Sequence, residues 1–260
     1  MLVHLRELYR YRDLLVSLTV RDIKVRYRQT LLGVAWAVLQ PVAFMGIFTL
    51  VFAKFGKVSS DGMPYPLFSY TALVPWTFFA TSLSLAVNSI AANMNLVKKI
   101  YFPREVFPIG AVLGCFVDFL VAGLLVAGLL VLYHRPANPQ LVWLPWLVGV
   151  EVVFLMSLSL LVSAMNVFYR DVKYLVPLGV QLWMFVTPVI YSTSVVPERL
   201  RPWYLLNPMA VVIDGIRHVV LHGQPPDVTA LMISTVVVVC LAAAAYGYFK
   251  RVEVKFADLI

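Results

Sequence analysis

A short charged and aromatic cluster, residues 95–108, separates two long apolar stretches of this chain. Aromatic rings that fill pockets, together with charges that fix orientation, are what protein interfaces use. The residues with this chemistry are Lys98, Lys99, Tyr101, Phe102, Arg104 and Glu105. The cluster therefore predicts a docking surface for another protein, with Tyr101 and Phe102 as anchors. A loop that only sets membrane topology would explain the lysines but not the Tyr-Phe-Pro-Arg-Glu run.

Two acidic residues, Asp118 and Glu151, lie inside apolar stretches. A charged side chain at the bilayer centre costs about 2.5–3.5 kcal/mol on insertion scales, so each acid must face protein or water, or be protonated. A proton relay is one interpretation, and pairing with hydroxyls or amides inside a helix bundle is the one we favour. The apolar stretches contain no Lys or Arg that could serve as a counter-charge.

Asp214, Arg217 and His218 are spaced so that they share one face of a helix and can pair there. We expect them to form a charged cluster at an external gate. An Asp–His pair would also suit a membrane-bound glycosyl- or acyltransferase, but the adjacent Arg217 favours a salt-bridge cluster. No catalytic residue and no metal site are predicted.

The composition identifies the setting of these residues. Of the 260 residues, 61% are hydrophobic and 13% charged, whereas soluble domains have nearer a quarter charged. The chain is therefore predicted to be an integral membrane protein with a single domain, residues 1–260. Its net charge of +8 then reflects positively charged loops rather than nucleic-acid binding. Cys115 and Cys240 lie in apolar runs and are interpreted as small hydrophobic residues.

Six apolar runs approach the roughly 20 residues needed to cross a bilayer, which predicts an all-α membrane fold. They cover about 33–53, 67–93, 108–133, 141–167, 174–192 and 228–249. Fifteen Lys and Arg fall on one side and six on the other, which places both termini in the cytoplasm. Residues 8–28 project as an amphipathic helix for the cytoplasmic membrane surface. Prolines divide residues 197–222 into two short re-entrant helices at the external face.

Four stretches resemble one family, the membrane subunits of type 2 ABC transporters that export O-antigen, teichoic acid or capsule polysaccharides. They are RDIKVRYRQTLLGVAWAVLQP, VKKIYFPREVFP, NVFYRDVKYLVPLGVQLWMFVTPVIYS and LLNPMAVVIDGIR. The resemblance implies a dimer around a channel in the cytoplasmic (inner) membrane, a lipid-linked polysaccharide as substrate and a coupling helix at residues 95–107. It also implies a separate ATPase subunit. The sequence has no G-x-x-x-x-G-K-[ST] loop, so ATP and Mg are expected in that partner, and this chain is expected to be neither an enzyme nor cofactor-dependent.

The resemblance further implies that the first and fifth spans line the channel, where rings would stack on sugar faces and amides would meet hydroxyls. The predicted path consists of Trp36, Gln40, Phe44, Phe48, Phe52, Tyr174, Gln181 and Phe185. Aromatic residues that face lipid are the alternative. Lys24, Arg26 and Arg28 would bind a lipid pyrophosphate at the cytoplasmic entrance, or else lipid headgroups. Arg170 and Asp171 would contact the ATPase, brace the first loop or form a plain charged turn.

Two other functions stay open on the sequence alone. A type 2 permease for a drug, a lipid or a small glycoconjugate would share every feature except the preference for sugars that the aromatic residues suggest. A polytopic transferase would need convergent acids at a membrane face. An adjacent gene for an ATPase would separate the transporters from the enzyme.

Overall fold

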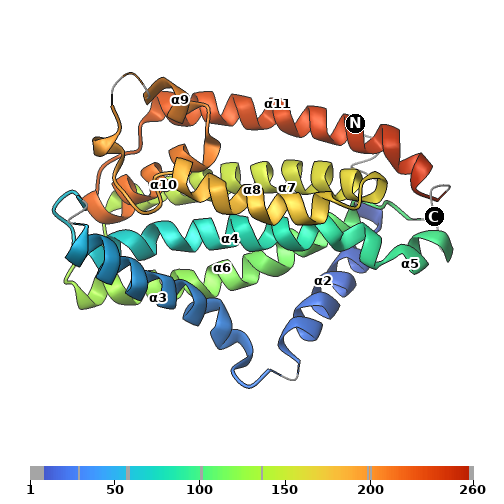
Figure 1. Cartoon of the computed structure of the whole chain (residues 1–260), viewed down its shortest axis with the longest axis horizontal. Coiled ribbons are helices and arrows are strands. Elements are labelled where there is room, and N and C mark those ends of the chain that lie inside the picture. The colour runs from blue at the N-terminus through green and yellow to red at the C-terminus, as the bar shows by residue number, and fades with distance from the viewer. Residues whose placement is uncertain are drawn as a thin grey trace.

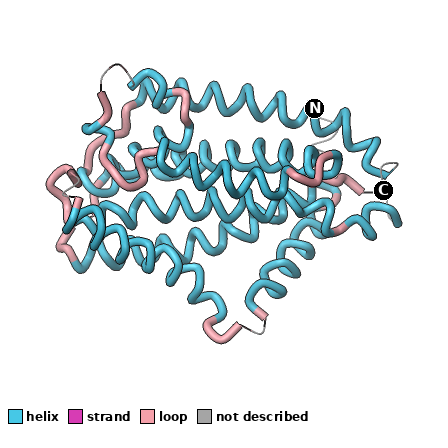
Figure 2. The backbone as a smooth tube through the Cα atoms, in the orientation of Figure 1, coloured by secondary structure: helices cyan, strands magenta, loops and turns pink. Residues whose placement is uncertain are grey.

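The computed structural model describes residues 9–28, 30–56, 59–99, 102–135, 137–197, 199 and 201–257, without the side chain of Lys99. All regular structure in these ranges is helical (Figure 2). The predicted all-α fold class is therefore confirmed at this level. Tyr101, one of the two predicted anchors, lies outside the described residues.

The first half of the chain forms a peripheral helix, a helix interrupted by a wider turn, and a long hairpin. Their bounds are α2 Arg12–Tyr27, a 3-10 turn Gly33–Ala35, α3 Trp36–Phe48, a π-helical continuation Thr49–Phe55, α4 Tyr65–Ala92, α5 Met94–Lys99 and α6 Val106–Leu132. In Figure 1, α2 and α3 form a V that projects from the bundle. The N-terminal part of the protein is thus attached to the outside of a helix bundle.

The second half returns through two long helices separated by short ones. Its elements are a 3-10 turn Pro139–Trp143, α7 Leu144–Phe168, α8 Val172–Val186, a 3-10 turn Thr193–Val195, α9 Arg201–Leu205, α10 Pro208–Arg217, a π-helical turn His218–His222, α11 Val228–Val252 and a final 3-10 turn Glu253–Ala257. The α5 helix and the end of α11 lie at one end of the bundle, and α9 and α10 lie at the other (Figure 1). We refer to these as the α5 end and the α10 end.

Among the residues that the structure describes, five helical stretches are long and apolar enough to cross a membrane. They are Gly33–Phe55, Tyr65–Ala92, Val106–Leu132, Pro139–Phe168 and Val228–Phe256. The span predicted at about 174–192 is different, because α8 has 15 residues and so measures about 22 Å at 1.5 Å per residue. That is less than the roughly 30 Å of bilayer hydrocarbon. Thr187 is extended because it precedes Pro188, a position that disfavours helix.

The core of the bundle is built around α4. This helix packs against α6, α7, α8 and α10, and α11 covers α7. Phe79 of α4 stacks on Phe154 of α7 with ring centroids 5.8 Å apart, and Trp183 of α8 meets both rings edge-on. Trp183, an aromatic residue of the predicted fifth span, is therefore part of the core and not of a channel wall.

Small residues allow α2 to lie close against α6. A Cβ atom at Gly110 would be 3.3 Å from Thr19 Oγ1, and one at Gly114 would also touch α2. Leu18 and Thr19 are buried in this contact, whereas Val25 is 68% exposed. The predicted apolar arc of this helix is therefore only partly right, since its buried face is set by the glycines of α6 and not by apolar residues alone.

A separate apolar cluster closes the α5 end of the bundle. It consists of Leu18, Ile90, Met94, Val97, Phe102, Val106, Phe107, Leu160, Ala164, Phe249 and Phe256. These residues come from α2, α4, α5, α6, α7, α11 and the final turn, and we call them the α5-end cluster. It holds together residues as far apart in the sequence as Leu18 and Phe256.

Candidate functional site

An ion pair joins the peripheral helix α2 to the middle of α6. Arg26 Nη1 donates to Asp118 Oδ2 at 2.5 Å, and the Tyr27 hydroxyl donates to Asp118 Oδ1 at 2.6 Å. The two charged side chains are 24% and 16% exposed. Burial and the hydrogen bond to Asp118 raise the pKa of Tyr27 to about 12, so the hydroxyl stays a donor. The Tyr27 hydroxyl agrees with the predicted pairing of Asp118 with a hydroxyl, but a counter-charge was not expected, and Arg26 supplies one from outside the apolar run.

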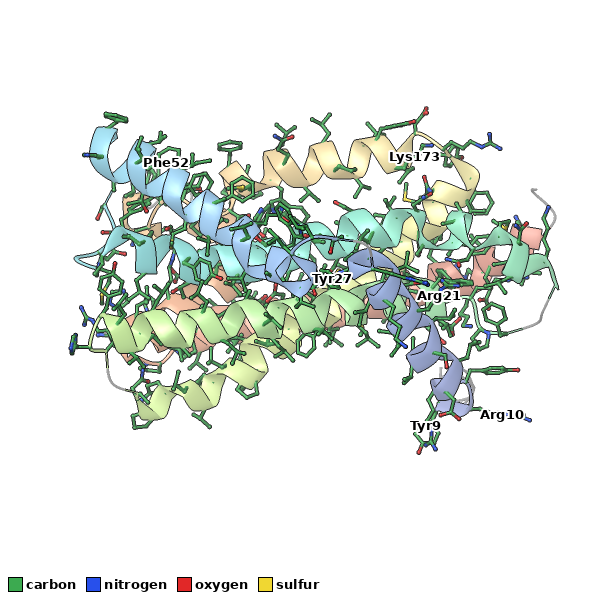
Figure 3. The ribbon with its side chains drawn as sticks, turned by 90° about the horizontal axis from the view of Figure 1, so that it is seen from below. Tyr9, Arg10, Arg21, Tyr27, Phe52 and Lys173 are labelled. Atoms are coloured by element: carbon green, nitrogen blue, oxygen red, sulfur yellow. The ribbon has the colours of Figure 1, made fainter. Side chains whose placement is uncertain are left out.

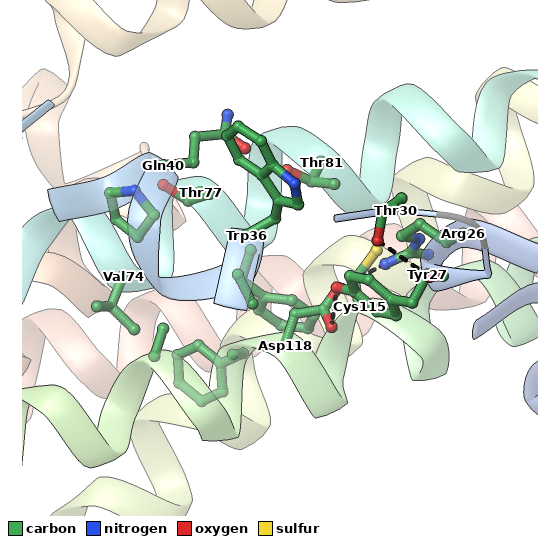
Figure 4. Close-up of a pocket in the computed structure, with 15 residues that line it drawn as sticks. Arg26, Tyr27, Thr30, Trp36, Gln40, Val74, Thr77, Thr81, Cys115 and Asp118 are labelled. Atoms are coloured by element: carbon green, nitrogen blue, oxygen red, sulfur yellow. Dashed lines mark hydrogen bonds and ion pairs between the residues drawn. The ribbon is translucent and has the colours of Figure 1, made fainter. Parts of the chain in front are cut away.

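This ion pair lies at the edge of a cavity of about 220 Å³ between α2, α3, α4 and α6 (Figure 4). Trp36 and Gln40 of α3, both predicted path residues, line it together with Asp118. The remaining wall is mixed, with threonine hydroxyls and phenylalanine rings from α4 and α6. Three predicted site residues, Arg26, Trp36 and Gln40, are thus brought together at one place.

The other predicted path residues of α3 lie farther along the same helix. The rings of Phe44, Phe48 and Phe52 follow one another with centroids 6.0 and 5.6 Å apart. Phe44 is exposed, whereas Phe48 and Phe52 pack partly against the core. Figure 3 shows Phe52 at the end of this segment away from Tyr27. The stripe predicted from spacing therefore exists, but only part of it faces outward.

The predicted path residues of α8 lie on an exposed face. Tyr174, Gln181 and Phe185 are all exposed. Because α8 packs on α4 and α7 while α3 packs on α4 and α6, one copy of the chain leaves these two faces as separate surfaces. A second copy or lipid must cover them.

The cations predicted to bind a pyrophosphate do not act as one set. Lys24 and Arg28 are exposed on α2 and its end, while Arg26 is held by Asp118. Figure 3 shows α2 running from Tyr9 and Arg10, at its far end, to Tyr27 at the junction with α3. Only Lys24 and Arg28 are therefore open to an external anion as the chain stands.

Most described residues of the predicted docking cluster make their contacts within this chain. Phe102 is 6% exposed within the α5-end cluster, and Glu105 is completely buried. Lys250 Nζ lies 2.8 Å from Glu105 Oε1, and Arg104 donates to the main-chain carbonyl of Glu253. Within this chain the end of α11 covers Phe102 and Glu105, so neither side chain is exposed, and their role in docking stays a prediction. Lys98 is exposed on α5, and the side chain of Lys99 lies outside the description.

The two loops at the α5 end lie side by side. A groove of about 470 Å³ is lined by Asn88 of α4 and Met94 of α5, and by Asn166 of α7, Arg170 of the turn after it and Lys173 of α8. The Lys173 main-chain N–H donates to Asn166 Oδ1 at 3.1 Å, which fixes that turn. Asp171 precedes α8 and is exposed. Arg170 thus lines the same groove as Met94, and its predicted contact with the ATPase or with the first loop stays a prediction.

The predicted external cluster is organised differently from expectation. Asp214 accepts a hydrogen bond from Thr193 and lies 3.8 Å from His218. Arg217 is buried and turns away from both, donating to the carbonyls of Pro188, Val189 and Tyr191. Its guanidinium also lies 3.6 Å from the ring centroid of Phe68. Arg217 therefore stabilises the non-helical segment after α8 and does not pair with Asp214.

Glu151 lies fully buried in α7, and neither of its oxygens has a hydrogen-bond partner within the described structure. The hydroxyl or amide partner predicted for it is therefore absent from these residues.

Sequence reasoning missed Lys250 and Tyr27, which complete the two ion-pair networks. Gly110, Gly114 and Asp118 follow one another at intervals of about one helical turn. Because small residues mark close helix packing, this spacing was a signal for the contact between α2 and α6.

The five stretches of spanning length found in the described part of the chain define a multi-pass membrane protein. Its cavity and the Arg26–Asp118 ion pair are formed where α2 and α3 meet the bundle. The chain belongs to the ABC-2 type transporter family, whose profile matches residues 13–221.

Similar proteins share nearly the whole chain. It is 33% identical over 258 residues to the O-antigen export system permease protein RfbA of Myxococcus xanthus, with 98% of each chain covered. A protein of the same name from Klebsiella pneumoniae is 30% identical over 250 residues, covering 95% of each. The polysialic acid transport protein KpsM of Escherichia coli is 20% identical over 240 residues, covering 88% of this chain and 91% of its own.

Proposed function

We propose that this chain is the permease subunit of an ABC transporter that exports a polysaccharide across the inner membrane. The observation that carries the proposal is the near full-length similarity to proteins named as O-antigen export permeases. A permease moves its substrate without chemical change, and the chain has no phosphate-binding loop of its own. ATP and Mg then bind in a separate ATPase subunit, which supplies the energy.

The topology that suits this function has six crossings with both termini in the cytoplasm. The α8 helix and the extended segment after it make the fifth crossing, and Arg217 supports this by bonding to the main-chain carbonyls of Pro188 and Val189 in that non-helical segment. α9 and α10 then enter the external face and return. The excess of Lys and Arg at the α5 end supports placing that end in the cytoplasm.

The ATPase contacts the α5 end. The exposed part of the docking surface consists of α5 with Lys98 and the groove with Arg170 and Lys173. Such basic residues orient an acidic partner surface, and Asn88 and Asn166 offer amide groups in the same groove. Phe102 and Glu105 support this surface from beneath.

The polysaccharide path forms between two copies of the chain. The exposed faces of α3 and α8 carry aromatic rings and an amide, including Phe44, Gln181 and Phe185, and such groups stack on sugars and bond to their hydroxyls. Dimerisation covers both faces at once. A lipid-linked polymer approaches along α2, where Lys24 and Arg28 present cations to its phosphates.

A gene deletion tests this function. A strain without this gene is expected to accumulate the polymer in the cytoplasm, with surface polymer restored by the wild-type gene.

The deletion strain is then complemented with a double variant, Arg170→Glu with Lys173→Glu, which reverses the charge of the groove. Lys54→Glu, at the other end of the bundle, is the matched control. The double reversal is expected to abolish surface polymer at normal permease levels. Normal surface polymer in the deletion strain would contradict polysaccharide export and favour a drug or lipid substrate.

A further inference from the structure

An ion-pair network joins the loop after α5 to the last helix. Both oxygens of Glu105 accept from Lys250 Nζ, at 2.8 and 2.9 Å, and Lys250 also pairs with Glu253 at 3.0 Å. The Tyr246 hydroxyl reaches Glu105 at 3.4 Å. One carboxylate of the loop is thus held by two residues of α11.

A second contact reinforces the first from the other direction. Arg104 donates to the Glu253 carbonyl and lies over the ring of Phe256 at 5.9 Å from its centroid. Phe256 is completely buried, and its ring packs against Phe168 and Phe249. The end of α11 therefore folds back over the loop instead of continuing into solution.

We infer that Glu105, Lys250, Glu253 and Arg104 form a brace that makes the last helix move with the loop. The inference rests on the proposed function, because the ATPase is what would push α5. α5 itself makes few contacts with the spans other than through α4 and the α5-end cluster. The brace gives the push a polar route into α11, in addition to the apolar contacts of the α5-end cluster.

The burial of Glu105 distinguishes a brace from an ordinary surface pair. Exposed ion pairs contribute little and exchange readily, but Glu105 is completely buried and Lys250 nearly so. Removing only one partner leaves an uncompensated buried charge, whereas removing both is often tolerated. The double variant Glu105→Gln with Lys250→Met therefore removes the buried ion pair of the brace and keeps the fold.

The test measures movement and coupling in the same complex of permease and ATPase in nanodiscs. Spin labels are placed at Asn95→Cys on α5 and Val254→Cys beyond α11, both exposed, after Cys115→Ser and Cys240→Ser. In the parent protein the label distance is expected to be narrow and unchanged by ATP. In the double variant it is expected to broaden and to change with ATP. Arg251→Met, which removes the adjacent exposed cation, is expected to behave as the parent.

The second readout is the ATP consumed per polymer exported. We expect the double variant to consume about tenfold more, a coupling loss of ordinary size, while Lys250→Arg keeps the parental ratio. The proposed brace would be refuted if the double variant kept the parental label distances and the parental ratio of ATP consumed to polymer exported. If the parent complex exports no polymer, the proposed function fails, and the label distances still decide whether the brace exists.

Discussion

Replacing Asp118 by Asn is expected to release α2 from the bundle. The substitution keeps the side-chain shape and an oxygen for the Tyr27 hydroxyl, but it removes the charge that Arg26 faces at 2.5 Å. The guanidinium then remains in a site where it is 24% exposed, without a counter-charge. Opening of α2 returns Arg26 to water, so the variant favours the open form.

The magnitude follows from this burial. Removing one partner of a fully buried pair costs about 3–5 kcal/mol. Arg26 keeps some contact with water, and the asparagine introduced in place of Asp118 would still accept a hydrogen bond, so we expect about 2 kcal/mol here. Since every 1.4 kcal/mol is about tenfold in an equilibrium constant, the open state should become about 30-fold more populated.

Cys115 reports this opening directly. It is buried and lines the same cavity as Arg26, so a thiol reagent labels it only when α2 lifts, and the labelling rate follows the open population. In a Cys240→Ala background, Asp118→Asn should label about 30-fold faster. Asp22→Asn, which breaks an exposed pair on the same helix, should change the rate little.

A double variant decides whether the unpaired charge is the cause. Arg26→Gln with Asp118→Asn leaves no buried charge and should return most of the protection. A labelling rate for Asp118→Asn close to that of the parent would refute the reasoning. So would a double variant that labels as fast as the single one, because the cost would then lie in packing and not in charge.

Three further substitutions test other parts of the structure, by thermal unfolding in detergent. Glu151→Met should stabilise the protein by about 1–3 kcal/mol, because it removes a buried carboxyl without a described partner; loss of export in this stable variant would indicate a proton relay. Gly215→Ala should destabilise by about 1–3 kcal/mol, because its Cβ would lie 2.7 Å from Leu147 Cδ2, and Leu147→Val should restore part of that loss. Arg217→Met should destabilise by about 3 kcal/mol through lost charge-assisted hydrogen bonds. Arg217→Lys should recover little, since an ammonium lacks the guanidinium fork.

The long helices could be predicted from sequence because hydrophobic length alone specifies them. The runs at about 67–93 and 108–133 agree with α4 and α6 within a few residues. The run at about 174–192 predicted too long a helix, because apolar residues continue past Val186 although α8 ends there. Pro188 ends the helix there, and Arg217, a cation nearly thirty residues away, holds the non-helical segment that follows through its carbonyls. Composition within one run does not contain that contact.

The candidate site could be predicted only where its chemistry is local. Trp36 and Gln40 were found from spacing on one helix, and both line the cavity. Asp118 and Glu105 were recognised as unusual charges, but their partners lie 92 and 145 residues away in sequence. Counting Lys and Arg on each side of the membrane identified no buried partner for Arg26 or Lys250. Packing instead used each of them to neutralise a buried acid.

The two ion pairs together give α6 a particular position in the mechanism. Glu105, just before its first turn, holds α11, and Asp118 holds α2. These positions are 13 residues apart, about 20 Å along the helix at 1.5 Å per residue. α2 leads directly into α3, the helix whose exposed face we assign to the polysaccharide path. A push on the loop before α6 therefore has two charged connections through which to act, one to the last helix and one to the wall of the path, and α6 is the element common to both.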